Sequence, residues 1–226
     1  MSRFVQPIGS RGSLKWIQRA VNERWPDLGD PIAAAIGTTI EWRSPLQADD
    51  YAEYRDGSFL DLVGIGDLRP ELAAFWPPRG PQLDALATGG DGEVILVEAK
   101  AHVGEMCSPP SGASEVSRAI IARSLSSCAE RLGARPGHGE WTDHFYQLAN
   151  RLAHLQFLLD NGVRARLVLV NFLNDREMSG PTAAETWEAA YHVAFHVLGL
   201  GKRHPLSRHI LHVFPEVNRP GAPVSQ

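Results

Sequence analysis

Two carboxylates and a lysine lie close together near the middle of the chain. Glu98 and Lys100 are two positions apart, and Asp84 precedes Glu98 by fourteen positions. Side chains two apart on a β-strand leave the same face, so Glu98 and Lys100 should point together. Carboxylates are hard oxygen ligands that suit Mg²⁺ or Mn²⁺, and a nearby ammonium can orient water or neutralise charge on phosphorus. These residue types indicate metal-dependent chemistry on a phosphate.

The segment that carries these residues has the pattern of a β-hairpin. Strand character is seen over 82–87 and over 93–101, and the turn between them, TGGDG at 88–92, is rich in residues that tolerate positive φ. The second strand contains the continuous apolar run VILV at 94–97, which is typical of a central strand covered on both faces. Antiparallel pairing would bring the two carboxylates to one end of the sheet.

The hairpin resembles the motif of the PD-(D/E)XK nuclease superfamily. The sequence PQLD at 81–84 followed by EAK at 98–100 matches the aspartate, the glutamate and the lysine of that motif, although the proline and the aspartate are not adjacent here. The matched motif spans residues 81–100. The element order expected of that fold covers about residues 13–173.

The resemblance implies a divalent-metal-dependent nuclease. In it, Asp84, Glu98 and the carbonyl of Ala99 would hold Mg²⁺ or Mn²⁺, and Lys100 would serve the attacking water. The implied substrate is nucleic acid, with DNA expected. Many members also use an acidic residue from the first helix, and Glu23 is the candidate for that position.

Periodicity and turn residues predict an α/β fold with a central mixed β-sheet flanked by helices. We expect one domain over 1–226, with a restriction-endonuclease-like core at about 13–173, a C-terminal helix–strand addition at about 174–217 and a loose tail at 218–226. Predicted helices span 13–28, 70–76, 114–132, 142–161 and 182–198. Further predicted strands span 38–42, 59–65, 166–172 and 208–214.

The composition narrows the class of protein. Hydrophobic residues make up 43% and charged residues 21% of the 226 residues, which is ordinary for a globular chain. The net charge of -4 argues against a protein that coats nucleic acid without specificity. The chain has neither an 18-residue apolar stretch nor a secretory leader pattern, so we expect a soluble, cytoplasmic protein without a membrane partner. A homodimer is compatible with the sequence, which does not select an oligomeric state.

Several polar residues near the hairpin are further candidates. His102 continues the face of Glu98 and Lys100, so it could touch substrate or a second metal, or be solvated. Gln147 belongs to a polar group on the helix predicted over 142–161, and it either faces the site or lies on a solvated surface. The other members of that group are Asn150, Arg151 and His154.

Alternative functions remain open at this point. Glu98 and Lys100 could be a structural pair at a sheet edge, and the chain could be a non-cleaving nucleic-acid or protein interaction module that retains the nuclease fold. His192 and His196 have the four-residue spacing of a zinc pair, which would suit a zinc hydrolase, although no HExxH motif accompanies them. Three arginines of the helix over 114–132 could guide a phosphate backbone or be solvated: Arg118, Arg123 and Arg131.

Overall fold

The structure is a computed structural model that describes residues 3–137 and 139–218. A five-stranded mixed sheet in the order β2-β4-β5-β6-β7 forms the centre of this part of the chain. The first three of these strands are antiparallel, whereas β6 and β7 run parallel to β5. The strands are β2 (Ile40–Ser44), β4 (Ala85–Gly89), β5 (Val94–Lys100), β6 (Ala165–Asn171) and β7 (Ile210–Val213). A separate pair joins β1 (Arg3–Phe4) to β3 (Glu53–Tyr54).

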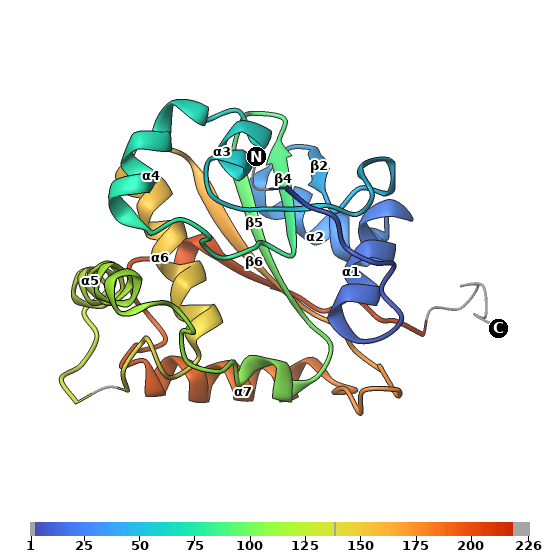
Figure 1. The fold of residues 1–226 in the computed structure, drawn as a ribbon. Coiled ribbons are helices and arrows are strands. Elements are labelled where there is room, and N and C mark those ends of the chain that lie inside the picture. The colour runs from blue at the N-terminus through green and yellow to red at the C-terminus, as the bar shows by residue number, and fades with distance from the viewer. Residues whose placement is uncertain (1–2, 138, 219–226) are drawn as a thin grey trace.

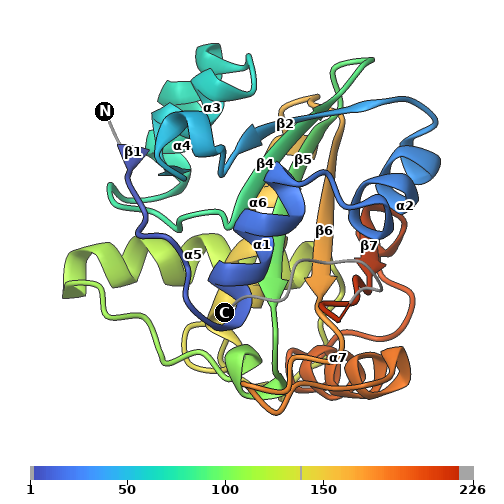
Figure 2. The same cartoon turned by 90° about the vertical axis from the view of Figure 1, so that its right-hand side faces the viewer.

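Helices cover both faces of the central sheet (Figures 1 and 2). The first face is covered by α1 (Gly12–Asn22) and α2 (Pro26–Ile36). The second face is covered by α3 (Gly57–Leu62), α4 (Arg69–Phe75), α5 (Glu115–Arg131), α6 (Tyr146–Asp160) and α7 (Ala184–Val197). Short 3-10 turns occupy Gln47–Asp49, Gly66–Leu68, Val103–Met106 and Ser207–His209.

Strand β5 divides the core into two layers. Ile95 and Val97 pack with α1 and α2, whereas Val94 and Leu96 pack with the helices of the second face. Because side chains alternate along a strand, Glu98 and Lys100 continue the row of Val94 and Leu96. The two charged residues therefore face the side of the sheet that α6 covers.

The predicted α/β class with a mixed central sheet flanked by helices is confirmed. The helix and strand expected after residue 173 are present as α7 and β7, and β7 extends the same sheet by pairing with β6. The tail prediction falls on residues 219–226, which lie outside the described part of the chain, and on Asn218, whose amide donates to the carbonyl of Asn174 at 3.0 Å. In the described residues, no helix combines the length and the apolar character needed to cross a bilayer.

The single helix predicted over 13–28 is wrong, because the structure has two helices there. α1 ends at Asn22, Arg24 adopts φ of 52°, and Trp25 is extended before α2 begins at Pro26. Proline cannot donate within a helix and restricts the residue before it, so Pro26 starts a new helix at its first position. Trp25 and Leu28 are nevertheless buried with α1, which explains why the apolar spacing suggested one helix.

The strand predicted over 59–65 is also wrong, because Gly57–Leu62 forms α3. Phe59, Leu60 and Val63 are the buried residues of this segment. Their spacing places them on one side of a helical turn rather than on one face of a strand. A short apolar run of this kind does not distinguish the two structures by periodicity alone.

Candidate active site

The β4–β5 hairpin brings Asp84 opposite Glu98. Ala85 pairs with Val97, so Asp84, one residue before β4, is the next position in the antiparallel register. The turn closes at Gly92, which adopts φ of 83°, a conformation that favours glycine. The residues of the hairpin itself thus set the relative position of the two carboxylates.

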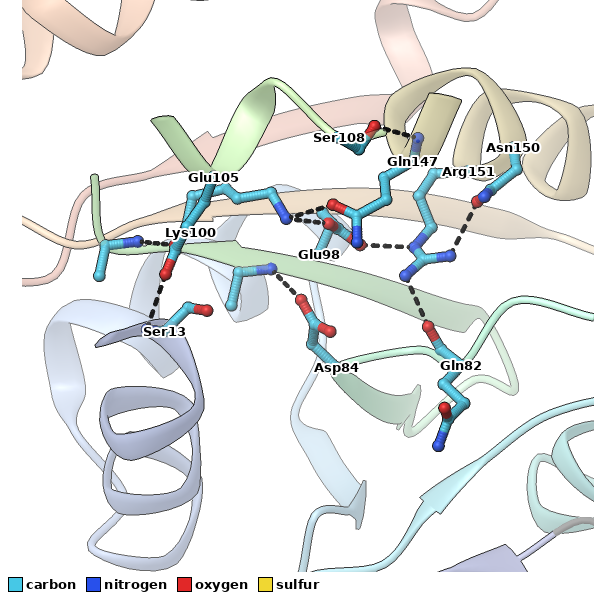
Figure 3. Close-up of polar contacts among 12 residues, drawn as sticks. Ser13, Gln82, Asp84, Glu98, Lys100, Glu105, Ser108, Gln147, Asn150 and Arg151 are labelled. Atoms are coloured by element: carbon cyan, nitrogen blue, oxygen red, sulfur yellow. Dashed lines mark hydrogen bonds and ion pairs between the residues drawn. The ribbon is translucent and has the colours of Figure 1, made fainter. Parts of the chain in front are cut away.

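Asp84 binds the backbone of β5. Its Oδ2 accepts a hydrogen bond from the N–H of Ala99 at 2.7 Å (Figure 3). The N–H and C=O of one strand residue leave the same edge, so the Ala99 carbonyl also points toward Asp84. The next carbonyl, of Lys100, accepts from Phe172 on the β6 side at 2.8 Å. The carbonyl expected to complete the metal site is therefore on the side of the aspartate.

Glu98 is enclosed by two cations. Its Oε1 accepts a hydrogen bond from the Lys100 ammonium, and its Oε2 accepts one from Nε of Arg151 at 2.6 Å. Glu98 is only 2% exposed, and Arg151 is 3% exposed. Arg151 comes from α6 and also donates to the carbonyl of Gln82 at 2.5 Å, so it ties the helix to the segment that leads into β4 (Figure 3).

Gln147 lies beside Lys100. Its side-chain carbonyl accepts a hydrogen bond from the ammonium at 2.9 Å, and its backbone N–H donates to the hydroxyl of Ser108 at 3.0 Å. A lysine ammonium has three N–H groups, and Glu98 and Gln147 engage two of them. The third is left for an additional acceptor.

Burial and neighbouring charges shift the pKa values of the three central residues. Burial, and then the charge of Glu98, raise the pKa of Asp84 to about 6. Burial also acts to raise the pKa of Glu98, but the charges of Arg151 and Lys100 outweigh it and lower that pKa. The pKa of Lys100 is raised, because the charges of Glu98 and Asp84 outweigh the effect of burial. Near neutral pH the site therefore holds an ionised glutamate between two cations.

A third carboxyl group, Glu53, approaches this site from β3. Tyr54 and Leu83 form an antiparallel bridge, which places the adjacent residues Glu53 and Asp84 next to each other. Burial, and then the charge of Asp84, raise the pKa of Glu53 to about 8. Its Oε2 accepts a hydrogen bond from the Gln6 amide at 2.8 Å. The structure thus lines up Glu53, Asp84 and Glu98 across neighbouring segments.

The structure does not bring Glu23 to these residues. Glu23 follows the last residue of α1 and accepts from Nε of Arg19 at 2.9 Å and from Nε1 of Trp25 at 2.8 Å. Helix α1 covers the face of the sheet opposite to the one that Glu98 and Lys100 face. Glu53 is the acidic residue that lies beside Asp84 instead.

His102 also lies apart from the central residues. β5 ends at Lys100, so the alternation of side chains stops before His102. Its Nε2 lies 3.7 Å from Oε1 of Glu105, and the side chain is 28% exposed. Glu105 itself accepts from the backbone N–H groups of Ala101 and Ser13.

The remaining sequence candidates are exposed. His192 and His196 lie on the exposed surface of α7, and the arginines 118, 123 and 131 are exposed on α5. Arg131 forms an ion pair of 2.6 Å with Asp160.

Arg151 and Glu53 are site residues that the sequence did not single out. Arg151 belongs to the polar group of the helix, and its position four residues after Gln147 places both on one helical face. This spacing is the sequence signal that could have indicated that Arg151 faces the site together with Gln147. Asn150, Arg151 and His154 are each 3% exposed, so this part of the group is buried rather than solvated. Glu53 had no signal, because its strand has only two residues.

The donor atoms suit a hard divalent cation by type. Asp84 and Glu98 repel each other, a cation between them would relieve this repulsion, and the Ala99 carbonyl is a further hard ligand. Both oxygens of Glu98 are already engaged by Lys100 and Arg151. In the described residues, no group of three or more His, Cys, Asp or Glu side chains is placed to hold a metal ion. Each carboxylate oxygen has two lone pairs, so each Glu98 oxygen keeps one lone pair for a metal ion beside its hydrogen bond.

Comparisons of the chain with family models, with curated proteins and with solved structures gave no match.

Proposed function

We propose that the chain is a divalent-metal-dependent nuclease of the PD-(D/E)XK type that hydrolyses phosphodiester bonds in nucleic acid, with DNA as the expected substrate. The observation that supports this most is the convergence of Asp84, Glu98 and Lys100 at one end of the sheet, with Gln147 bound to the lysine. Burying so many charged and polar groups together is costly unless they serve each other or a ligand.

In this proposal Asp84, Glu98 and the Ala99 carbonyl hold Mg²⁺ or Mn²⁺. Such an ion, when bound, polarises the phosphate and activates water for in-line attack. Glu53 lies next to Asp84 and is a further oxygen donor near this ligand set. The type of the donor atoms and the repulsion between neighbouring carboxylates support this assignment.

Lys100 has the task of contacting the reacting groups. Glu98 and Gln147 fix the direction of its ammonium, and its third N–H remains for a phosphate oxygen or for the attacking water. A pre-oriented cation stabilises the charge that develops on phosphorus without having to reorganise during the reaction. Gln147 is thus a positioning residue for the ammonium.

The test is Mn²⁺- and Mg²⁺-dependent cleavage of single-stranded, duplex and branched DNA. Lys100→Ala should lower the rate by about 100-fold or more, because one transition-state donor is lost. It should leave Mn²⁺ binding measurable by calorimetry. Asp84→Asn should lose both cleavage and Mn²⁺ binding. Equal rates in wild type and both variants would contradict the assignment.

Matched controls exist on the surface. Lys202→Ala and Asp67→Asn make the same chemical changes at exposed positions away from the hairpin. Both control variants should cleave at the wild-type rate. A comparable loss in these controls would show that the effects arise from general charge rather than from the site.

The second candidate function is a non-cleaving nucleic-acid or protein interaction module. The observation that favours it is the occupation of both Glu98 oxygens by Lys100 and Arg151, which satisfies the glutamate without a metal. Calorimetry separates the two functions. If no Mn²⁺ binding depends on Asp84 and Glu98 while nucleic acid or a protein partner still binds, the module is the correct description.

A further inference from the structure

An apolar cavity of about 390 Å³ lies beside the candidate active site. It is lined by residues of α3, α4, α6 and the segment that leads into β4. Its wall is mostly aromatic and aliphatic, with residues including Phe59, Leu72, Trp76, Pro81 and Leu83. The remaining wall includes the ring of His154 and the charged residues Asp56 and Arg69. This combination of an apolar lining and a few polar groups is typical of a small-ligand site.

His154 provides a neutral hydrogen-bonding group in this wall. Its Nδ1 lies 2.8 Å from the carbonyl of Asn150, so Nδ1 carries the proton and Nε2 is left as an acceptor. Burial lowers the pKa of His154 to about 4, which keeps the ring uncharged near neutral pH. The ring centroids of Trp76 and His154 lie 4.7 Å apart, in an edge-to-face arrangement.

The cavity and the candidate active site share their walls. Leu83 lines the cavity, and the next residue is Asp84; consecutive Cα atoms are about 3.8 Å apart. Arg151, which binds Glu98, donates to the carbonyl of Gln82, and His154 follows Arg151 by less than one turn of α6. Figure 3 shows the end of the Arg151 side chain bound to the carbonyl of Gln82, two residues before Asp84. The cavity and the candidate active site are thus built from consecutive residues of one segment and from neighbouring positions of α6.

We propose that this cavity binds one unpaired nucleobase of the nucleic-acid chain whose phosphodiester lies at Asp84 and Lys100, an inference that rests on the proposed function. A base has planar, apolar faces that can stack on the aromatic lining. Its edge carries N–H groups that can donate a hydrogen bond to Nε2 of His154. A base inside a duplex is stacked and paired, so it cannot enter a cavity without leaving the helix. The substrate class is therefore a nucleic acid with an unpaired nucleotide at the cleavage site.

Two adjacent alanines of α4 allow a matched test. Ala73 lines this cavity and is exposed, so Ala73→Phe would fill the space without removing core contacts. Ala74 is equally exposed but lines a different cavity between α4, α5 and α6, so Ala74→Phe is the control. Thermal unfolding of both variants checks that the fold is retained.

Binding is measured by fluorescence anisotropy in EDTA with two labelled probes. One is a short single-stranded oligodeoxyadenylate, and the other is an abasic strand of equal length. Wild type and Ala74→Phe should bind the strand with bases about tenfold more tightly than the abasic strand. Ala73→Phe should bind the two strands equally. The proposal is overturned if the wild type binds both strands with equal affinity or binds neither strand. It is also overturned if the two variants show the same ratio of affinities for the two strands.

The absence of metal from this experiment separates it from the proposed function. If wild type discriminates bases from abasic sugars but shows no Mn²⁺-dependent cleavage, the cavity assignment stands and the nuclease assignment fails. If cleavage occurs and base discrimination is absent, the cavity assignment alone fails.

Discussion

The guanidinium of Arg151 on α6 donates to the carboxylate of Glu98 on β5 across 2.6 Å, and both side chains are only 3% exposed. The two residues are far apart in sequence, so this ion pair joins the helix to the hairpin. Water is excluded from both partners, and removing one would leave the other with less compensation for its lost hydration. The pair therefore links the stability of the fold to the arrangement of the candidate site.

Arg151→Met should destabilise the protein by about 3 kcal/mol, because a buried charge loses a partner while the side chain keeps a similar length. The measurement is the free energy of unfolding in urea. Arg131→Met is the matched control, since Arg131 forms an exposed ion pair with Asp160 and its loss should cost less than about 1 kcal/mol. A similar decrease in the free energy of unfolding of the two variants would show that the buried Glu98 carboxylate does not need Arg151 as its partner.

Gly92→Ala should destabilise the hairpin by about 1 kcal/mol. The turn requires φ of 83° at this residue, a conformation that costs an L-amino acid about that much, although no atom lies within 4 Å of the added methyl group. Gly112→Ala is the control, because it has equal space and no positive φ. Denaturant unfolding of both variants checks the prediction, which fails if the control loses as much stability as Gly92→Ala.

Glu53 should make the metal-free protein less stable as the pH rises from about 4.5 to about 8. Its folded pKa of about 8 lies above the ordinary value of 4.5, so the folded state retains a proton that the unfolded state has released in this window. Stability therefore falls as the pH increases through the window. Asp84, whose pKa is raised to about 6, contributes in the same direction at the lower end.

Glu53→Gln should flatten this dependence, because the amide resembles the protonated acid and does not titrate. Urea unfolding of wild type and variant in EDTA at several pH values tests it. The exposed Glu188 provides the control change Glu188→Gln, which should leave the pH profile as in wild type. A wild-type slope that survives in Glu53→Gln would assign the dependence to another group.

Mn²⁺ should raise the midpoint of thermal unfolding of the wild type, since a ligand that binds only the folded state stabilises it. At a concentration of about 100 times the dissociation constant the gain is about 2.7 kcal/mol. Glu98→Gln should show no such shift, whatever its own midpoint, and EDTA should reverse the shift in wild type. An equal shift in both proteins would place the metal elsewhere.

The hairpin could be predicted because its signals are local. The residues of its turn favour positive φ, and the apolar run VILV at 94–97 indicates a strand buried on both faces. The observed strand Val94–Lys100 matches that reading closely. Where two local signals competed, as at Pro26 within a helix-like pattern, the backbone restriction of proline outweighed the apolar spacing.

The sequence by itself determined that Asp84, Glu98 and Lys100 share a hairpin, and it singled out Gln147 on a later helix. Only the tertiary structure decided which groups surround them. Arg151 reaches Glu98 because β6 pairs in parallel with β5, and α6 connects the two strands across the face of the sheet. Glu53 reaches Asp84 because Tyr54 of the short strand β3 pairs with Leu83, the residue before Asp84. Periodicity reports which side chains are buried, whereas the identity of their neighbours depends on pairings between distant segments, which no local pattern encodes.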